Sequence, residues 1–230
     1  MHPLLQTPFC TLYHDVAFGA YLKMAKLARA SGRGRKWDLD RDASTLKLGR
    51  VTFPVQFLGT ESAVTETWQW ADAEAQRALT PDQVRRCVEA RNLGRVRDAD
   101  SFGADKFPLT NQLGQPDGRS MAAVCCELTG ASAFYPCEHD EGVVWVLLDD
   151  PRIDGQTLDV QGWIDAFNSF LFAYPCDHRH AVERYVRRSG MTVYEATKLE
   201  VSFELTTGEL MSLTVKEFDE DTIQTVMKQL

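Results

Sequence analysis

Two short segments of the chain concentrate residue types that bind metal ions or transfer protons. They are Cys137-Glu138-His139 and Cys176-Asp177-His178-Arg179-His180. Thiolate and imidazole groups are ligands that Zn²⁺ prefers. The candidate zinc ligands are Cys137, His139, Cys176, His178 and His180. Structural zinc sites usually contain two cysteines at C-x₂₋₄-C spacing or two histidines at H-x₃₋₅-H spacing. Neither segment contains such a pair.

The alternative for these two segments is structural. The first would form a polar hairpin turn, and the second would begin a helix that Asp177 caps. We favour this alternative, so we predict no cofactor and keep zinc as the competing hypothesis.

A cysteine nucleophile activated by a histidine is the second chemistry that these residue types allow. Cys126 or Cys137 would need a lowered thiol pKa and hydrogen-bond contact with His139 or His178. Cys126, however, lies in the apolar segment 121–128, where cysteine usually behaves as a small hydrophobic residue. The chain contains no G-x-S-x-G, Walker, G-x-G-x-x-G or H-E-x-x-H motif. We therefore predict no catalytic residue.

Four aromatic residues are candidates for a binding surface. Trp68 and Trp70 share one face of a predicted strand, where they would line a ligand cleft or a partner surface. Trp37 and Tyr135 would extend this surface if their strands adjoin. The alternative is that Trp68 and Trp70 belong to the core and are covered by the first helix.

Composition restricts the class of protein. The 230 residues are 44% hydrophobic and 25% charged, which is ordinary for a globular protein. No apolar run is long enough to span a bilayer, and no secretory signal pattern opens the sequence. With a net charge of −8, the chain lacks the positive surface that nucleic-acid binding needs. Six cysteines without an export signal indicate free thiols and a cytoplasmic location.

Helical elements are predicted from the spacing of apolar residues and from their caps. Thr80-Pro81-Asp82-Gln83 has the pattern of a capping box, which begins a helix. The other helices are predicted over residues 11–31, 119–129, 160–174, 179–189 and 219–230. Residues 92–118 are predicted to form a long loop, and residues 151–159 a linker.

Strands are predicted where apolar residues alternate with polar ones, and short polar turns join them into hairpins or a meander. They cover parts of residues 37–57, 67–70, 131–136, 142–148, 199–205 and 210–215. The order favours an α+β fold, in which an antiparallel sheet packs against the N-terminal helix and further helices. We expect one unit over residues 1–230, with a possible subdivision into 1–150 and 159–230.

With these elements placed, the chain resembles a bacterial family of similar length that is known only as a domain of unknown function. The most specific matching feature is Thr67-Trp68-Gln69-Trp70-Ala71. The other matching features are Leu58-Gly59-Thr60, Lys106-Phe107-Pro108-Leu109, Ala122-Ala123, Leu128-Thr129-Gly130-Ala131, Tyr135, and Asp177-His178-Arg179 with Ala181 and Tyr185. The chain departs from the family pattern at Ala71-Asp72, where another aromatic residue commonly follows the second tryptophan. The resemblance implies no activity.

Two main hypotheses about function follow, beside a third in which the chain is a self-associating scaffold with exposed apolar patches. The first is a non-catalytic cytosolic binding protein that recognises another, basic protein, as immunity-type proteins do, without nucleic-acid or membrane partners. An acidic surface would speed such recognition. The second is a small-molecule or hydrolytic enzyme that uses the Cys/His residues, with or without zinc. It requires these residues to converge around one pocket.

Overall fold

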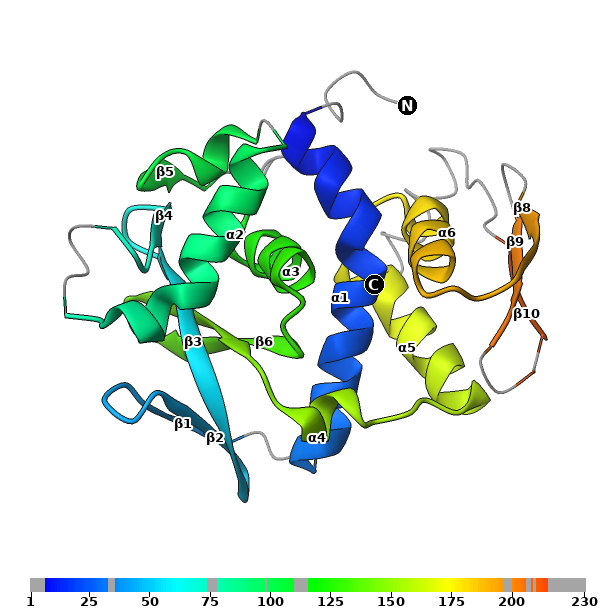
Figure 1. Cartoon of the computed structure of the whole chain (residues 1–230), viewed down its shortest axis with the longest axis horizontal. Helices are drawn as coiled ribbons and strands as arrows, with labels where there is room; N and C mark the ends of the chain where they lie inside the picture. Colours follow the sequence, from blue (N-terminus) through cyan, green and yellow to red (C-terminus); the bar gives the residue numbers. More distant parts are fainter. Residues whose placement is uncertain are drawn as a thin grey trace, which may run out of the picture.

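A long N-terminal helix, α1 (Pro8–Ser31), lies between a seven-stranded sheet and a group of C-terminal helices (Figure 1). The computed structural model describes residues 7–32, 36–73, 78–97, 99–109, 116–196, 200–205, 208 and 210–214. Thr7 caps α1, since its side chain accepts a hydrogen bond from the Cys10 N–H at 3.1 Å. Gly32 ends the helix with a φ of 72°. The predicted helix is confirmed and begins one turn earlier.

The seven-stranded sheet is antiparallel throughout. Its strands are β1 (Trp37–Asp40), β2 (Thr45–Leu48), β3 (Val51–Ser62), β4 (Thr67–Trp70), β5 (Lys106–Pro108), β6 (Ala133–His139) and β7 (Gly142–Leu148). The long strand β3 is central, because it pairs with β2, β4 and β7 along its length. Its register shifts between Phe57 and Gly59, an irregularity of the kind that bends strands. The predicted α+β fold with antiparallel hairpins is confirmed.

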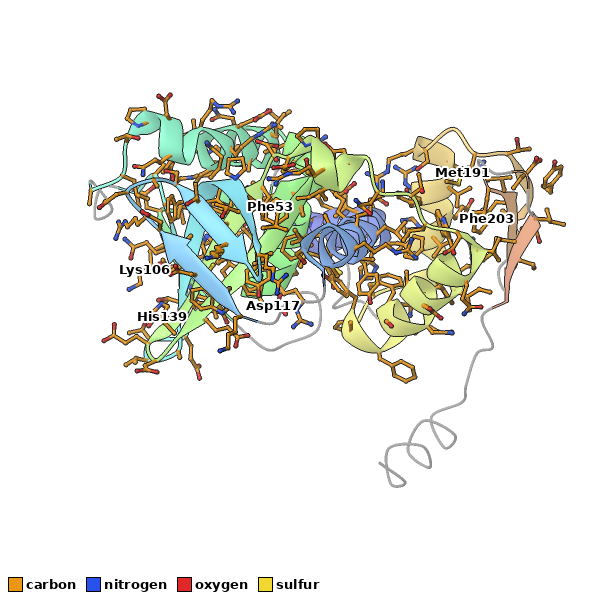
Figure 2. All side chains as sticks on the ribbon, turned by 90° about the horizontal axis from the view of Figure 1, so that it is seen from below. Phe53, Lys106, Asp117, His139, Met191 and Phe203 are labelled. Atoms are coloured by element: carbon orange, nitrogen blue, oxygen red, sulfur yellow. The ribbon has the colours of Figure 1, made fainter. Side chains whose placement is uncertain are left out.

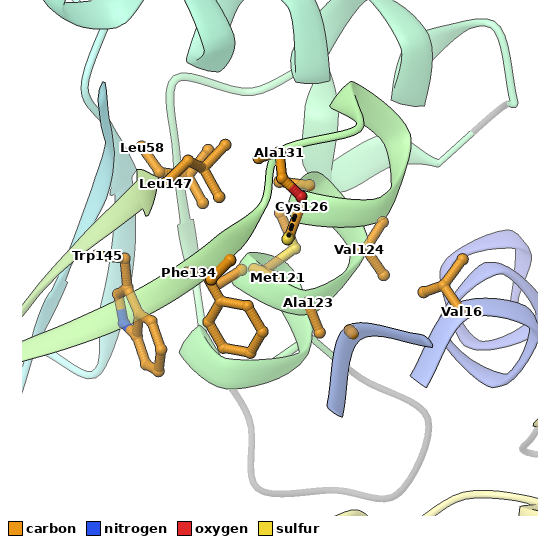
Figure 3. Packing of buried hydrophobic residues seen from close by; sticks show 14 of the residues in the cluster. Val16, Leu58, Met121, Ala123, Val124, Cys126, Ala131, Phe134, Trp145 and Leu147 are labelled. Atoms are coloured by element: carbon orange, nitrogen blue, oxygen red, sulfur yellow. Dashed lines mark hydrogen bonds between the residues drawn. The ribbon is translucent and has the colours of Figure 1, made fainter. Parts of the chain in front are cut away.

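Helix α3 (Gly118–Thr129) lies in the centre of this part of the chain. It packs against α1, against α2 (Arg85–Arg95) and against the sheet. Figure 3 shows Met121, Ala123 and Val124 of α3 between Phe134 of the sheet and Val16 of α1. Most α3 side chains are small, so α1, α2 and the sheet can all approach this helix closely.

The ends of α3 are fixed by local hydrogen bonds. The Asp117 carboxylate accepts from the Ser120 N–H at 2.6 Å, and the Ser120 hydroxyl accepts from the Asp117 N–H at 2.9 Å. At the other end Gly130 adopts a φ of 67°, and the Cys126 thiol donates to the Ala131 carbonyl at 3.4 Å (Figure 3). These contacts fix both ends of α3.

A buried arginine ties the region around β4, α2 and β5 together. Arg91 on α2 donates to the Asp72 and Asp105 carboxylates, each at 2.7 Å. Its guanidinium also lies 5.7 Å from the ring centroid of Trp70. Two short 3₁₀ turns connect these elements along the chain. The turn η3 (Pro81–Val84) lies between β4 and α2, and η4 (Asp100–Phe102) lies between α2 and β5. The buried cation is tolerated because it is paired and hydrogen-bonded on several sides.

The C-terminal group consists of three helices and a small antiparallel sheet. The helices are α4 (Pro151–Asp154), α5 (Val160–Ala173) and α6 (His178–Arg188). The sheet has the order β10-β9-β8 and contains β8 (Val193–Ala196), β9 (Glu200–Glu204) and β10 (Leu210–Thr214). Phe18 of α1 contacts the rings of Trp163, Phe170 and Tyr185. One continuous cluster of buried residues therefore joins this group to the rest of the chain.

Two local predictions need correction. Residues 151–159 are not simply a linker, because Asp150 caps α4 and Ile153 is buried in the core. Residues 92–118 are not one long loop, since α2 extends to Arg95 and the described part of the segment contains η4 and β5. The helix predicted over residues 219–230 lies outside the described residues. Among the helices that the described residues form, none is long and apolar enough to cross a membrane.

The close packing of α2 against η4 gives a testable prediction. A Cβ on Gly94 would lie 2.2 Å from Cγ of the buried Phe102 ring. We expect Gly94→Ala to lower the free energy of unfolding by about 1–3 kcal/mol, because overpacking outweighs the gain of ~1 kcal/mol in helix propensity. Urea unfolding measures this change. Asn92→Ala, at an exposed position of the same helix, is the matched control and should change stability by less than ~0.5 kcal/mol. Equal effects of the two substitutions would contradict the packing.

Candidate functional site

The first candidate segment lies on the β6–β7 hairpin. Cys137 is buried in β6 opposite Val144, whereas His139 is exposed at the end of the strand. The His139 ring stays within its own turn, where Nδ1 accepts a hydrogen bond from the Glu141 N–H at 3.3 Å. The cysteine and the histidine therefore have different surroundings, one in the core and one in solvent.

The second segment begins α6. The Asp177 side chain accepts from the His180 N–H at 2.9 Å and caps the helix, as we favoured from the sequence. His178 Nε2 lies 2.8 Å from the Tyr174 carbonyl, and its ring packs edge-on against Phe170 at 5.1 Å. Each of these contacts has a structural role.

His180 connects α6 to α1. Its Nε2 lies 2.6 Å from Oδ1 of Asp15, and Arg184 donates to the other oxygen of the same carboxylate at 3.2 Å. The Arg188 guanidinium adds a hydrogen bond to the Asp15 carbonyl at 2.9 Å. The histidine thus belongs to a polar contact that holds α6 against α1.

The two Cys/His segments do not meet. The β6–β7 hairpin and α6 lie on opposite sides of α1, and in Figure 2 His139 is far from Met191, which follows α6. Among the described residues there is no group of three or more His, Cys, Asp or Glu side chains arranged to hold a metal ion. The convergence that the zinc site and the Cys/His enzyme both require is absent from the described part of the chain.

The thiols are also poorly suited to act as nucleophiles. Burial raises the pKa of Cys126 and of Cys137 to about 12. Burial likewise raises the pKa of Cys10, Cys125 and Cys176 above the ordinary value of a thiol. Because the thiolate is the reactive form, these raised pKa values disfavour a nucleophilic thiol near neutral pH.

The four aromatic candidates do not form one binding surface. Trp68 and Trp70 are each 0% exposed, so the predicted exposed surface at this pair is corrected to a core contact. Trp70 packs 5.4 Å from the Phe102 ring and donates from Nε1 to the Ser101 carbonyl at 3.1 Å. Residues of η4 therefore cover Trp70, Phe107 of β5 stacks against Trp68, and Phe9 at the start of α1 lies 6.4 Å from Phe102.

Trp37 and Tyr135 are half-buried and belong to strands that do not adjoin. Trp37 lies on β1, which reaches β3 through β2, and Tyr135 lies on β6, which reaches β3 through β7. Neither side chain extends the surface of the other.

Sheet register brings two acidic turns together at one end of the molecule, which the sequence alone did not predict. The β3–β4 turn, residues 63–66, and the end of the β6–β7 hairpin, residues 138–141, lie side by side because Ser62 pairs with Gly142. The Ala63 N–H donates to the Glu141 carbonyl at 3.0 Å and joins them directly. We call these eight exposed residues the paired turns. Their carboxylates are those of Glu66, Glu138, Asp140 and Glu141.

Gly142 allows the two turns to approach so closely. Its φ is 150°, and a Cβ at this position would lie 1.9 Å from the Glu61 carbonyl oxygen. Glu61 itself precedes the first turn and is half-buried. Burial raises the pKa of its carboxyl group, while the Trp145 Nε1–H donates to that group at 3.2 Å. The base of the paired turns is therefore held rigidly, while their tips are free in solvent.

Two partly buried histidines, His14 on α1 and His178 on α6, predict how stability depends on pH. Burial lowers the pKa of His14 and of His178. Below about pH 6.5 the unfolded chain binds protons that the folded chain does not, so the free energy of unfolding should fall as the pH is lowered from 7. Urea unfolding at a series of pH values measures this slope.

His178→Gln should flatten the slope, because glutamine donates to the Tyr174 carbonyl without titrating. His139→Gln removes an exposed imidazole and is the matched control, which should keep the slope of the original chain. Parallel slopes for His178→Gln and for the original chain would contradict the assignment.

Comparisons with known proteins place the chain in a family. Residues 11–151 match the model of a family of unknown function, DUF6882. The match covers more than half of the chain, and it includes the seven-stranded sheet, α3 and the paired turns. No curated protein and no solved structure matches the chain. The chain therefore belongs to this family of unknown function, DUF6882.

Proposed function

We propose that the protein is a non-catalytic, cytosolic binding protein that recognises a basic region of another protein through the paired turns. The observation that carries this proposal is the gathering of Glu66, Glu138, Asp140 and Glu141 in two turns that sheet register holds together. Neither turn contains a lysine or an arginine. The turns thus present negative charge on a fixed scaffold.

These carboxylates are available to a partner. Within the part of the chain that the structure describes, none of the four forms an ion pair. By contrast, the carboxylates of Asp72, Asp149 and Asp150 are each paired with an arginine. Unpaired charge of one sign steers a partner of opposite charge and raises the association rate.

The surroundings of the carboxylates also suit a protein partner. Val64 lies in the first turn and is 79% exposed, so it offers an apolar contact beside the charges. Protein interfaces commonly combine an apolar centre with a polar rim. Because the hairpin ladders already order the turns, binding requires little additional ordering of the backbone.

The enzyme hypothesis has less support from the described residues. It needs Cys137, His139, Cys176, His178 and His180 around one pocket, with or without zinc. Two of these residues lie on β6 and three lie at the start of α6, across α1 from each other (Figure 1). The raised pKa values of Cys137 and Cys176 also disfavour a thiolate nucleophile.

A charge-reversal experiment tests the proposed function. The test variant carries Glu66→Lys, Glu138→Lys, Asp140→Lys and Glu141→Lys. The control variant carries Asp38→Lys, Asp42→Lys, Asp82→Lys and Asp165→Lys, four exposed acidic positions elsewhere with the same change in net charge. Immobilised chains are exposed to an extract of the source cells, and the retained proteins are identified by mass spectrometry. We expect a basic protein that the original chain and the control retain and the test variant does not.

The association rate of that purified partner with the original chain should then fall at least about tenfold between low and high salt. The proposal is wrong if both variants retain the same proteins, or if the control loses the partner as fully as the test variant does. It is also wrong if the retained proteins are not basic.

A further inference from the structure

A pocket with a volume of about 410 Å³ lies where the start of α1, η4 and β5 meet. Two phenylalanine rings, Phe9 and Phe107, and three prolines supply most of its apolar lining, and Asp100 and Ser101 supply polar groups. We call it the Phe9/Phe107 pocket. Its volume falls within the roughly 300–1,000 Å³ of small-molecule pockets, so it can hold one long side chain.

The Phe9/Phe107 pocket adjoins the paired turns. Pro108 lines the pocket, and the next residue, Leu109, donates from its N–H to the Glu66 carbonyl of the paired turns at 2.7 Å. Figure 2 shows Lys106 of β5 and His139 of the paired turns at the same end of the molecule. One segment of a partner protein can therefore contact the pocket and the acidic turns together.

The charge of the pocket is negative. Asp100 is exposed and forms no ion pair within the described part of the chain. The described lining residues include no lysine or arginine. The start of α1 contributes a positive charge of about half a unit, which the full charge of the carboxylate outweighs. The pocket is therefore complementary to a cation.

A hydroxyl group in the pocket wall has an unused hydrogen-bonding capacity. Ser101 Oγ is shielded from solvent and has no hydrogen-bond partner among the described residues. The Ser101 carbonyl, by contrast, accepts from Trp70 Nε1 at 3.1 Å. Buried polar groups are nearly always hydrogen-bonded, so this hydroxyl is a candidate for contact with a bound group. It can turn toward such a group, because side chains at interfaces commonly change rotamer on binding.

We propose that the Phe9/Phe107 pocket receives an arginine side chain of the basic protein that the paired turns bind. The inference rests on the proposed function and names one residue type of the partner. A planar guanidinium stacks on aromatic rings, and its five N–H groups suffice for the Asp100 carboxylate and the Ser101 hydroxyl. The ammonium of lysine is compact and more strongly hydrated, so it fits the apolar walls less well.

The test uses the full chain and N-acetyl-arginine N-methylamide as the probe, so it does not require the partner to be known. The lysine counterpart and the citrulline counterpart, which has nearly the shape of arginine without its charge, are the control probes. Binding is followed by NMR through the ring signals of Phe9 and Phe107 and the amide signal of Ser101. Probe concentrations reach about 20 mM, because a single side chain is expected to bind in the millimolar range.

We expect saturable shifts of these signals with the arginine probe and weaker binding of both control probes. Asp100→Asn should weaken binding of the arginine probe about threefold or more, whereas Asp42→Asn, at an exposed acidic position on another turn, should not change it. Ala104→Phe should block the pocket, and it should leave the fold intact because Ala104 is exposed. The same substitution should weaken the partner retained in the charge-reversal experiment about tenfold or more.

Three results would overturn the inference. One is the absence of saturable shifts at Phe9 and Phe107, and another is equally tight binding of the citrulline and arginine probes, since the pocket would then recognise shape and not charge. The third is a retained partner that binds the Ala104→Phe variant as tightly as the original chain. Each of these results can occur while the paired turns still retain a basic protein, so the proposed function is judged separately by the charge-reversal experiment.

Discussion

The burial of α3 on every side is the constraint on which the rest of the structure depends. Its residues face α1, α2 and the sheet at once, so most of its buried side chains must be small, and the Glu127 carboxylate beside α1 is paired with Lys23 at 2.9 Å. Ala122, Ala123, Cys125 and Cys126 satisfy this requirement and are all 0% exposed. The adjacent cysteines are therefore explained by packing, because a thiol fills slightly more space than the methyl group of alanine and still behaves as a small apolar group. The same burial removes these thiols from acid–base chemistry.

The arrangement around α3 determines what remains for function. Helix α1 packs against α3 on one side and against the aromatic residues of the C-terminal group on the other, so both sides of α1 are used for packing (Figure 2). Charged residues inside this arrangement are neutralised locally, as Arg91 is by Asp72 and Asp105. Exposed carboxylates of the paired turns and exposed apolar side chains of α5, such as Ile164 and Phe172, lie at the two ends of the molecule. Both are surfaces suited to contacts with protein segments.

Much of the fold could be predicted because it is local in sequence. Thr80 and Gln83 form the predicted capping contact, with Gln83 Oε1 accepting from the Thr80 N–H at 2.7 Å. Spacing alone left open whether Trp68 and Trp70 belong to the core or to a surface, because Phe102, which packs against Trp70, lies more than 30 residues further along the chain. The paired turns could not be predicted from local patterns either, because the pairing of Ser62 with Gly142 is a contact between residues far apart in the sequence. Spacing alone also left open whether the two Cys/His segments meet. Topology separates their elements, which lie on either side of α1.

The central claim is that the cysteines and histidines among the described residues serve packing, capping and local hydrogen bonds, as the binding function that we propose requires. The most direct test is the rate of thiol alkylation in the native protein between about pH 6 and pH 10, with each cysteine followed by peptide mass spectrometry. We predict that the buried thiols, such as Cys87, Cys125 and Cys126, react only when the chain unfolds. Cys176 is half-buried and its pKa is raised, so it should react slowly at the lower end of this range and faster as the pH rises. One cysteine that reacts rapidly below about pH 7 would be a thiolate nucleophile, and it would contradict the claim.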